Sequence, residues 1–189
     1  AVGDARARFA EDPLRMMRAV RLAVELDFSL DVPTSRAIWA ARDELSSVSR
    51  ERIADEFNRI LLSRAPGVGL RLLVDLGLMA QVIPDLLALR DVAPGRRAKD
   101  VFEHTRRVVE STPPDFITRW AALLHDVGKP RTVQVVDGEV HFPGHERVGE
   151  VMARAVMNDL RQEQHAIDRV ARLVGMHMRA NQYESAWTD

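Results

Sequence analysis

The sequence has no cysteine, no long apolar run and no excess of charge of either sign. Without cysteine, disulfides and thiolate metal sites are excluded, so histidine and carboxylate are the plausible metal ligands. Charges interrupt every apolar stretch well before the roughly 18 residues that a membrane span needs, and no basic-then-apolar leader opens the chain. We therefore expect a cytoplasmic protein that does not associate with a membrane.

The near balance of 27 Lys and Arg against 28 Asp and Glu excludes a polycation that binds nucleic acid by bulk charge. Any contact with RNA must be local. A chain of 189 residues with 46% apolar residues can bury a real core, and we expect two helical subdomains. The chain begins at Ala1 and ends shortly after Trp187 without closing an obvious element, so we expect it to be part of a longer protein.

Apolar residues recur at helical spacing through the first half of the chain. Residues 9–28 are predicted to form one helix, with Asp12 as its cap and Pro13 in its first turn. Further helices are expected over residues 33–45, 52–62 and 68–76, followed by a compact corner around Gly77.

A segment rich in Pro, Gly and charge over residues 91–99 predicts a domain boundary, which divides the chain into residues 1–92 and 93–189. The second unit is expected to contain helices over residues 101–111, 116–126, 147–159 and 164–178. Between them, residues 131–136 and 139–142 alternate in the manner of strands around the tight turn Asp137-Gly138. The fold class predicted is all-α, mostly helical, with one small β-hairpin.

Four of the six histidines lie at or beside predicted helix ends: His104, His125, His145 and His177. His125-Asp126 closes the apolar run of residues 121–124, and burying an adjacent imidazole and carboxylate there is costly unless something binds both. A divalent cation does so, since it accepts imidazole and carboxylate ligands. His141 and His165 are interpreted as surface residues.

Three motifs, Glu103-His104-Thr105, Leu124-His125-Asp126-Val127-Gly128-Lys129-Pro130 and Gly144-His145-Glu146, together resemble the HD phosphohydrolase superfamily over residues 101–177. The resemblance implies a divalent metal (Mg, Mn, Ni, Fe or Zn) on His104, His125 and Asp126, with His145 and His177 as candidates for a second metal. The family's late Asp ligand has no match here: Asp168 falls in the wrong part of the order, and Asp189 is the last residue. We expect that ligand beyond the end of this sequence.

Such a site would hydrolyse phosphomonoesters or cyclic phosphodiesters, because a bound metal lowers the pKa of water and neutralises phosphoryl charge. His125 and Asp126 are the predicted catalytic pair. Lys129 and Arg131 follow them and are candidates to bind phosphate, although a short basic cluster is more often a solvated loop.

The segment Glu11-Asp12-Pro13-Leu14-Arg15-Met16-Met17-Arg18 spaces Arg15 three residues from Asp12 and four from Glu11, which predicts that they share a helix face. A carboxylate and a guanidinium side by side can pair with the edge of a nucleotide base. On spacing alone, a surface salt-bridge ladder is the commoner interpretation.

Glu11 to Arg18, with Ala19-Val20-Arg21-Leu22 and Leu26-Asp27-Phe28, resembles the neck motif of class II tRNA nucleotidyltransferases and bacterial poly(A) polymerases. Val48-Ser49-Arg50-Glu51-Arg52-Ile53 with Glu56-Phe57 resembles their next motif. The resemblance implies that Asp12 and Arg15 template an incoming CTP or ATP, that Glu11 orients Arg15, and that Arg18 contacts the triphosphate. Arg52 and Glu56 are then expected to brace helices.

The transfer chemistry of that family needs a head domain with a Gly-Ser phosphate loop and an Asp-x-Asp pair, and this sequence contains neither. We therefore expect the neck and HD body of a CCA-adding or poly(A)-adding enzyme, unable by itself to join nucleotides to a tRNA or other RNA 3′ end. Two alternatives are a free-standing HD phosphohydrolase acting on nucleotides or cyclic phosphates, and a non-enzymatic RNA-binding body with a vestigial HD site.

Overall fold

The computed structural model describes residues 3–92 and 100–180. Within them the chain is helical apart from one two-stranded antiparallel hairpin, which confirms the predicted fold class. The first half forms α1 (Ala5–Glu11), α2 (Leu14–Glu25), α3 (Val32–Ala41), η1 (Arg42–Ser47), α4 (Arg50–Leu61), α5 (Pro66–Asp75), α6 (Met79–Val82) and η2 (Pro84–Arg90). The second half forms α7 (Val101–Ser111), α8 (Phe116–Leu124), α9 (Lys129–Thr132), β1 (Gln134–Val136), β2 (Glu139–His141), α10 (His145–Asp159) and α11 (Gln164–Ala180).

The single helix predicted over residues 9–28 is wrong, because the chain forms two helices that meet at Asp12 and Pro13. Asp12 is extended, with φ −151° and ψ 99°. A residue that precedes proline avoids the helical region, since the proline ring clashes with its backbone. The Asp12 side chain accepts a hydrogen bond from the backbone N–H of Leu14 at 3.2 Å, so its predicted capping role holds.

Several other helices begin where a polar side chain or a proline favours a helix N-terminus. Asp31, Asp100 and Asp115 accept backbone N–H bonds in the first turns of α3, α7 and α8, and Pro66 is in the first turn of α5. The helix predicted over residues 33–45 instead ends at Ala41 and continues as the 3₁₀ helix η1.

The hairpin pairs Val135 with Val140, and its turn residues Asp137 and Gly138 both have positive φ, as the sequence predicts for a tight two-residue turn. The prediction that strand structure starts at Arg131 is wrong, because residues 129–132 form the short helix α9. Pro130 is the second residue of α9, in the first helical turn, where its missing N–H costs no helical hydrogen bond.

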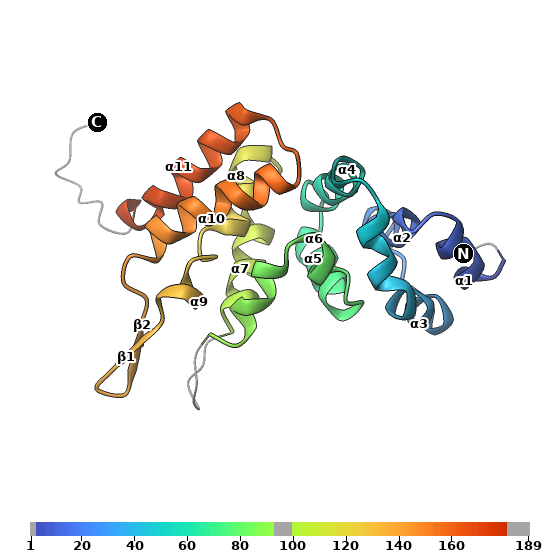
Figure 1. The fold of residues 1–189 in the computed structure, drawn as a ribbon, viewed down its shortest axis with the longest axis horizontal. Coiled ribbons are helices and arrows are strands. Elements are labelled where there is room, and N and C mark those ends of the chain that lie inside the picture. The colour runs from blue at the N-terminus through green and yellow to red at the C-terminus, as the bar shows by residue number, and fades with distance from the viewer. Residues whose placement is uncertain (1–2, 93–99, 181–189) are drawn as a thin grey trace.

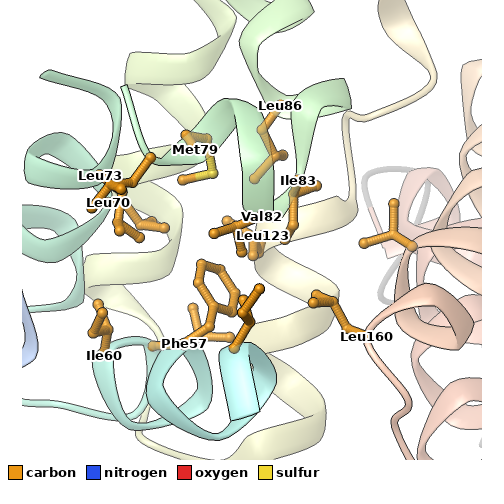
Figure 2. Packing of buried hydrophobic residues seen from close by; sticks show 14 of the residues in the cluster. Phe57, Ile60, Leu70, Leu73, Met79, Val82, Ile83, Leu86, Leu123 and Leu160 are labelled. Carbon is orange, nitrogen blue, oxygen red and sulfur yellow. The ribbon is translucent and has the colours of Figure 1, made fainter. Parts of the chain in front are cut away.

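α1 to α3 lie at one end of the molecule, α7 to α11 at the other, and α4 to α6 lie between them (Figure 1). One hydrophobic cluster runs through the described residues from Phe9 to Val174. Figure 2 shows part of this cluster, with Phe57 of α4, Leu123 of α8 and Leu160 after α10 together with residues of α5 and α6. The division at residues 92 and 93 stays a prediction, and residues 93–99 of its expected boundary lie outside the described residues.

None of the helices in residues 3–92 and 100–180 combines the length and the apolar character that crossing a bilayer requires.

Candidate metal centre and nucleotide-binding segment

Asp126 lies at the centre of a cluster of histidines drawn from four helices. α8 ends at Leu124, so His125 caps the helix and Asp126 turns inward, where its side chain is 2% exposed. α7 contributes His104, the first residue of α10 is His145, and α11 contributes His177 in its last turn. The four histidines predicted as metal ligands therefore meet around the predicted carboxylate.

Each carboxylate oxygen of Asp126 faces two imidazoles through their Nε2 atoms. Oδ2 lies 3.1 Å from His125 and 3.9 Å from His104. Oδ1 lies 3.5 Å from His145 and 4.0 Å from His177. The donor atoms thus form two groups that could each hold a metal ion, His104 with His125 and Asp126, and His145 with His177 and Asp126.

Backbone carbonyls orient three of these imidazoles through their Nδ1 atoms. The Nδ1 atom of His125 lies 2.8 Å from the Ala122 oxygen, that of His145 lies 2.8 Å from the Phe142 oxygen, and that of His177 lies 2.7 Å from the Val174 oxygen. A neutral imidazole that donates Nδ1–H carries its lone pair on Nε2. Histidines that bind metals commonly donate their other ring N–H to a backbone carbonyl in this way. The imidazole nitrogens and the carboxylate therefore fit a divalent cation.

The Nε2 atoms of His145 and His177 lie 3.1 Å apart. Because both rings use Nδ1 to reach carbonyls, two neutral rings would direct lone pairs at each other. The contact is favourable when one ring is protonated or when a cation lies between the two nitrogens.

Protonation in the cluster is strongly perturbed. Burial alone would raise the pKa of Asp126, but the contacts with His125 and His145 in their protonated forms and the hydrogen bond from Lys129 hold that pKa far below its usual range. The hydrogen bond to Asp126 raises the pKa of His145, whereas burial lowers the pKa of His177 and of His104. Asp126 is therefore ionised, as a metal ligand must be.

No carboxylate from the later part of the chain joins the cluster within the residues that the structure describes. Asp168 instead pairs with Arg154 on the outer side of α11, which agrees with its exclusion from the sequence motif. Asp189 lies outside the described residues. His141 and His165 are exposed, so their assignment to the surface is confirmed.

Lys129 is in contact with the cluster, and its Nζ donates to Asp126 Oδ2 at 2.7 Å. Its Nζ also lies 5.4 Å from the centre of the Phe142 ring. Arg131 turns the other way and reaches Asp85 of η2 at 3.3 Å. Of the two predicted phosphate ligands, Lys129 therefore contacts the carboxylate of the histidine cluster and Arg131 contacts Asp85 instead.

Sequence reasoning missed the positioning role of Gly128. A Cβ atom on Gly128 would lie 2.2 Å from the His145 carbonyl oxygen and 2.7 Å from the Gly149 nitrogen. Only glycine lets the start of α9 approach the first turn of α10 this closely, and that approach brings His145 to Asp126. The signal was a glycine two residues after Asp126.

In the amino-terminal segment, the structure pairs Arg15 with Glu11 through a 2.6 Å contact across the break between α1 and α2. Arg15 also donates to the Arg8 carbonyl at 3.0 Å. Asp12 does not pair with Arg15 but faces α4, where Arg52 lies 3.3 Å away, and Arg18 lies 3.8 Å away. The break at Pro13 explains the difference, because Asp12 and Arg15 do not share one continuous helix.

Glu56 of α4 is 5% exposed and accepts hydrogen bonds from the Nε atoms of Arg18 and Arg21 of α2. Arg52 of α4 also contacts Asp12, which lies just before α2. Glu56 and Arg52 therefore hold α4 against α2, as expected of helix-bracing residues. Beside them is a cavity of about 600 Å³ whose lining combines arginine with apolar side chains, among them Arg8, Phe9, Arg15, Arg18, Leu22 and Phe28. Its size suits a small molecule.

A helical body with a His and Asp cluster of this kind defines an HD-domain protein, and residues 99–186 match the model of the HD domain. Residues 27–89 match a second family model, described as the probable RNA and SrmB-binding site of polymerase A. The chain thus combines a region similar to the probable RNA-binding site of polymerase A with an HD domain.

The curated relatives are tRNA nucleotidyltransferases. The chain is 34% identical to an A-adding tRNA nucleotidyltransferase of Deinococcus radiodurans over 88% of its own length and 42% of that protein. It is 37% identical to a CC-adding tRNA nucleotidyltransferase of Thermus thermophilus over 89% of its length and 42% of that protein. A multifunctional CCA protein of an Azoarcus strain is 35% identical over 81% of this chain and 39% of the relative.

The predicted relationship to the class II tRNA nucleotidyltransferase family is confirmed, and this chain belongs to that family through its neck and HD regions. The chain spans about two fifths of the length of the curated relatives it matches.

Proposed function

We propose that this chain is the neck and HD body of a tRNA nucleotidyltransferase, with a metal-dependent phosphohydrolase site around Asp126 and a nucleotide-binding segment at Glu11 to Arg18. The observation that carries the hydrolase part is the buried Asp126 carboxylate, which faces the Nε2 atoms of four histidines.

His104, His125 and Asp126 would hold one divalent metal ion, and His145 and His177 would hold a second through the other oxygen of Asp126. When bound, such an ion supplies a nucleophilic water at neutral pH and neutralises charge on phosphoryl oxygens. The carbonyls of Ala122, Phe142 and Val174 keep the rings oriented, so binding needs little rearrangement.

A substrate would enter the proposed site beside His104. The His104 side chain is 55% exposed, whereas those of His125 and His145 are 14% and 7% exposed. A phosphate ester can therefore approach past His104, and Lys129, which now pairs with Asp126, supplies a positive charge at the inner wall.

An assay of phosphate ester hydrolysis tests the proposal. p-Nitrophenyl phosphate and a 2′,3′-cyclic nucleotide are incubated with the chain and each of Mg, Mn, Ni, Fe and Zn. We expect metal-dependent turnover that Asp126→Asn abolishes and that the surface variant His165→Ala retains. Equal turnover in the wild type and Asp126→Asn would remove the hydrolase assignment.

We further propose that Asp12 and Arg15 read the base edge of CTP or ATP, that Glu11 orients Arg15, and that Arg18 contacts the triphosphate. The support is the cavity of about 600 Å³ that Arg15 and Arg18 line together with Phe28. Phe28 is 66% exposed and offers a ring for base stacking. The Glu11 carboxylate holds the Arg15 guanidinium at the cavity wall.

Titration of CTP, ATP, GTP and UTP against the chain tests this assignment. We expect CTP and ATP to bind more tightly than GTP and UTP, and Asp12→Ala or Arg15→Ala to remove the preference. Arg6→Ala, an exposed neighbour on α1, is the control. Base selection that survives in both Asp12→Ala and Arg15→Ala would exclude templating, and hydrolysis without nucleotide or RNA binding would favour a free-standing phosphohydrolase.

The proposed macromolecular partner is the 3′ end of a tRNA or another RNA. The match of residues 27–89 to an RNA-binding region and the names of the relatives support it. Because the chain carries almost no net charge, the contact must depend on a local group of basic residues.

A further inference from the structure

α2 and α4 direct charged side chains into one hollow between them. Arg18 and Arg21 are three residues apart on α2, and Arg52, Glu56 and Arg59 follow at helical spacing on α4. We name this hollow the arginine cavity. Its volume is about 450 Å³, and its lining is Leu14, Arg18, Arg21, Arg52, Asp55, Glu56 and Arg59.

The buried carboxylate of Glu56 fixes two of these guanidinium groups. It accepts Nε–H from Arg18 at 3.0 Å and from Arg21 at 2.7 Å. Both bonds use the Nε atom, so neither Glu56 bond occupies a terminal Nη nitrogen, although Nη1 of Arg21 donates to Glu25 at 2.5 Å. For Arg18, the recorded terminal contact is a long one, 3.8 Å to Asp12. The planes of the two forks are therefore set before any ligand arrives, which lowers the entropy cost of binding.

Four arginines line the cavity with two carboxylates, and two further carboxylates beside the lining pair with three of the arginines. Glu25 contacts Arg21 at 2.5 Å, and Asp12 contacts Arg52 at 3.3 Å and Arg18 at 3.8 Å. Arg59 is exposed and, among the described residues, makes no ion pair or side-chain hydrogen bond, so its guanidinium is the cation of the cavity that is open to a ligand. Leu14 is the sole large apolar side chain in the lining, so the cavity does not suit a base or a lipid chain. Arginine forks match the oxygens of a phosphate group.

Arg18 lines both the arginine cavity and the neighbouring cavity assigned to the incoming nucleotide. A phosphate held in the arginine cavity therefore lies directly beside the nucleotide site. A bound RNA strand whose end must meet an incoming nucleotide needs its backbone held at such a position.

We propose that the arginine cavity binds a backbone phosphodiester of single-stranded RNA, with Arg59 as the principal donor and the terminal nitrogens of Arg18 beside it. This inference rests on the proposed binding of nucleotide and RNA by the neck. A nucleotide triphosphate offers the same phosphate chemistry, and the experiment separates the two sources.

The experiment measures the affinity of the full 189-residue chain for a fluorescein-labelled single-stranded RNA of mixed sequence by anisotropy at several KCl concentrations. Arg59→Ala is the test variant, because the side chain is exposed and its loss leaves the Glu56 contacts intact. Arg64→Ala, an exposed arginine outside the lining, matches the charge change. CTP affinity is measured on the same variants.

We expect Arg59→Ala to weaken RNA binding by about threefold to tenfold and to reduce the slope of log affinity against log salt by about 0.7, the value for one lost single-strand phosphate contact. Arg59→Lys should restore part of both, while Arg64→Ala and CTP binding by Arg59→Ala should match the wild type.

Three results would overturn the inference in distinguishable ways. RNA affinity and salt slope unchanged in Arg59→Ala would reject the arginine cavity while leaving RNA binding by the neck intact. A loss of CTP affinity equal to the loss of RNA affinity would assign the cavity to the triphosphate. A wild-type chain that binds no RNA would remove both this inference and the proposed RNA partner.

Discussion

The Nε2 atoms of His145 and His177 lie 3.1 Å apart, although 32 residues separate them in the sequence. Their Nδ1 atoms face the carbonyls of Phe142 and Val174, so both lone pairs turn inward toward Asp126. A divalent cation between these groups would accept both lone pairs and the carboxylate oxygen as ligands. This contact is therefore the strongest geometric support for a metal site in the cluster.

Loss of either imidazole should weaken metal binding. We expect His177→Ala and His145→Ala to reduce the affinity for Mn or Ni by at least about tenfold, because each removes a donor from the group around Asp126. Isothermal titration calorimetry measures the change. His165→Ala removes an exposed imidazole from the start of α11 and should bind metal as the wild type does. Equal affinity in all three variants would exclude the second group as ligands.

Gly128→Ala should disturb the same cluster from the backbone. Its Cβ would lie 2.2 Å from the His145 carbonyl oxygen, so α9 and α10 must separate. We expect a loss of about 2 kcal/mol in the free energy of unfolding, together with weaker metal binding.

Gly138→Ala is the comparison for that variant. The hairpin turn leaves open space around Gly138, although its φ of 81° makes alanine unfavourable by about 1 kcal/mol. Gly138→Ala should therefore lower stability and leave metal affinity unchanged. Chemical denaturation and calorimetry on both variants test this, and the prediction fails if Gly128→Ala binds metal as tightly as Gly138→Ala.

Arg119 should be a major contributor to stability. It is 4% exposed and donates to the carbonyls of Leu61, Ser63 and Thr112, which end α4 and α7. Burial lowers the pKa of Arg119. We expect Arg119→Met to cost about 3 kcal/mol of unfolding free energy, since it leaves buried carbonyls without donors.

Urea unfolding of Arg119→Met beside Arg172→Met provides the measurement. Arg172 is an exposed residue of α11, so its replacement should change stability by less than about 0.5 kcal/mol. A cost for Arg119→Met as small as that for Arg172→Met would show that the carbonyls find other donors.

Stability should depend on acid through Glu103. Hydrogen bonds from Arg106, opposed by partial burial, lower the pKa of Glu103 from 4.5 to about 2. A carboxyl whose pKa is lower in the folded state than in the unfolded state stabilises the fold at pH values above its unfolded pKa. This stabilisation is lost as the pH falls through the folded-state pKa. We expect the melting temperature of the wild type to exceed that of Glu103→Gln by about 2 °C at neutral pH.

That difference should narrow as the pH is lowered from about 5 to about 3, where Glu103 begins to bind a proton in the unfolded chain. Glu139→Gln, on the exposed strand β2, serves as the control and should show a difference near zero throughout. A gap between wild type and Glu103→Gln that stays constant or widens in acid would contradict the assigned role.

The sequence predicted which histidines lie near Asp126, because the residue types and their positions near helix ends indicate a shared site. An adjacent His125 and Asp126 at the end of an apolar run is costly to bury alone, and that cost pointed to a cation. The predicted positions of His104, His145 and His177 near helix ends agree with the cluster that the structure forms. Their assignment as metal ligands stays a prediction.

The features that sequence reasoning missed depend on distances between segments. Arg119 is unremarkable in an amphipathic helix pattern, and only the meeting of α4, α7 and α8 gives it three carbonyl partners. The contact of Asp12 with Arg52 crosses 40 residues and follows from the break at Pro13. Spacing along one expected helix therefore paired Asp12 with the wrong arginine.

The most direct test of the account is the metal content of the purified chain, measured by elemental analysis beside His125→Ala and Asp126→Ala prepared identically. The account predicts roughly one or two ions of Fe, Mn, Ni, Zn or Mg per wild-type chain, lost in both variants. A wild-type chain that holds no metal even after soaking, or variants that hold as much as the wild type, would contradict it.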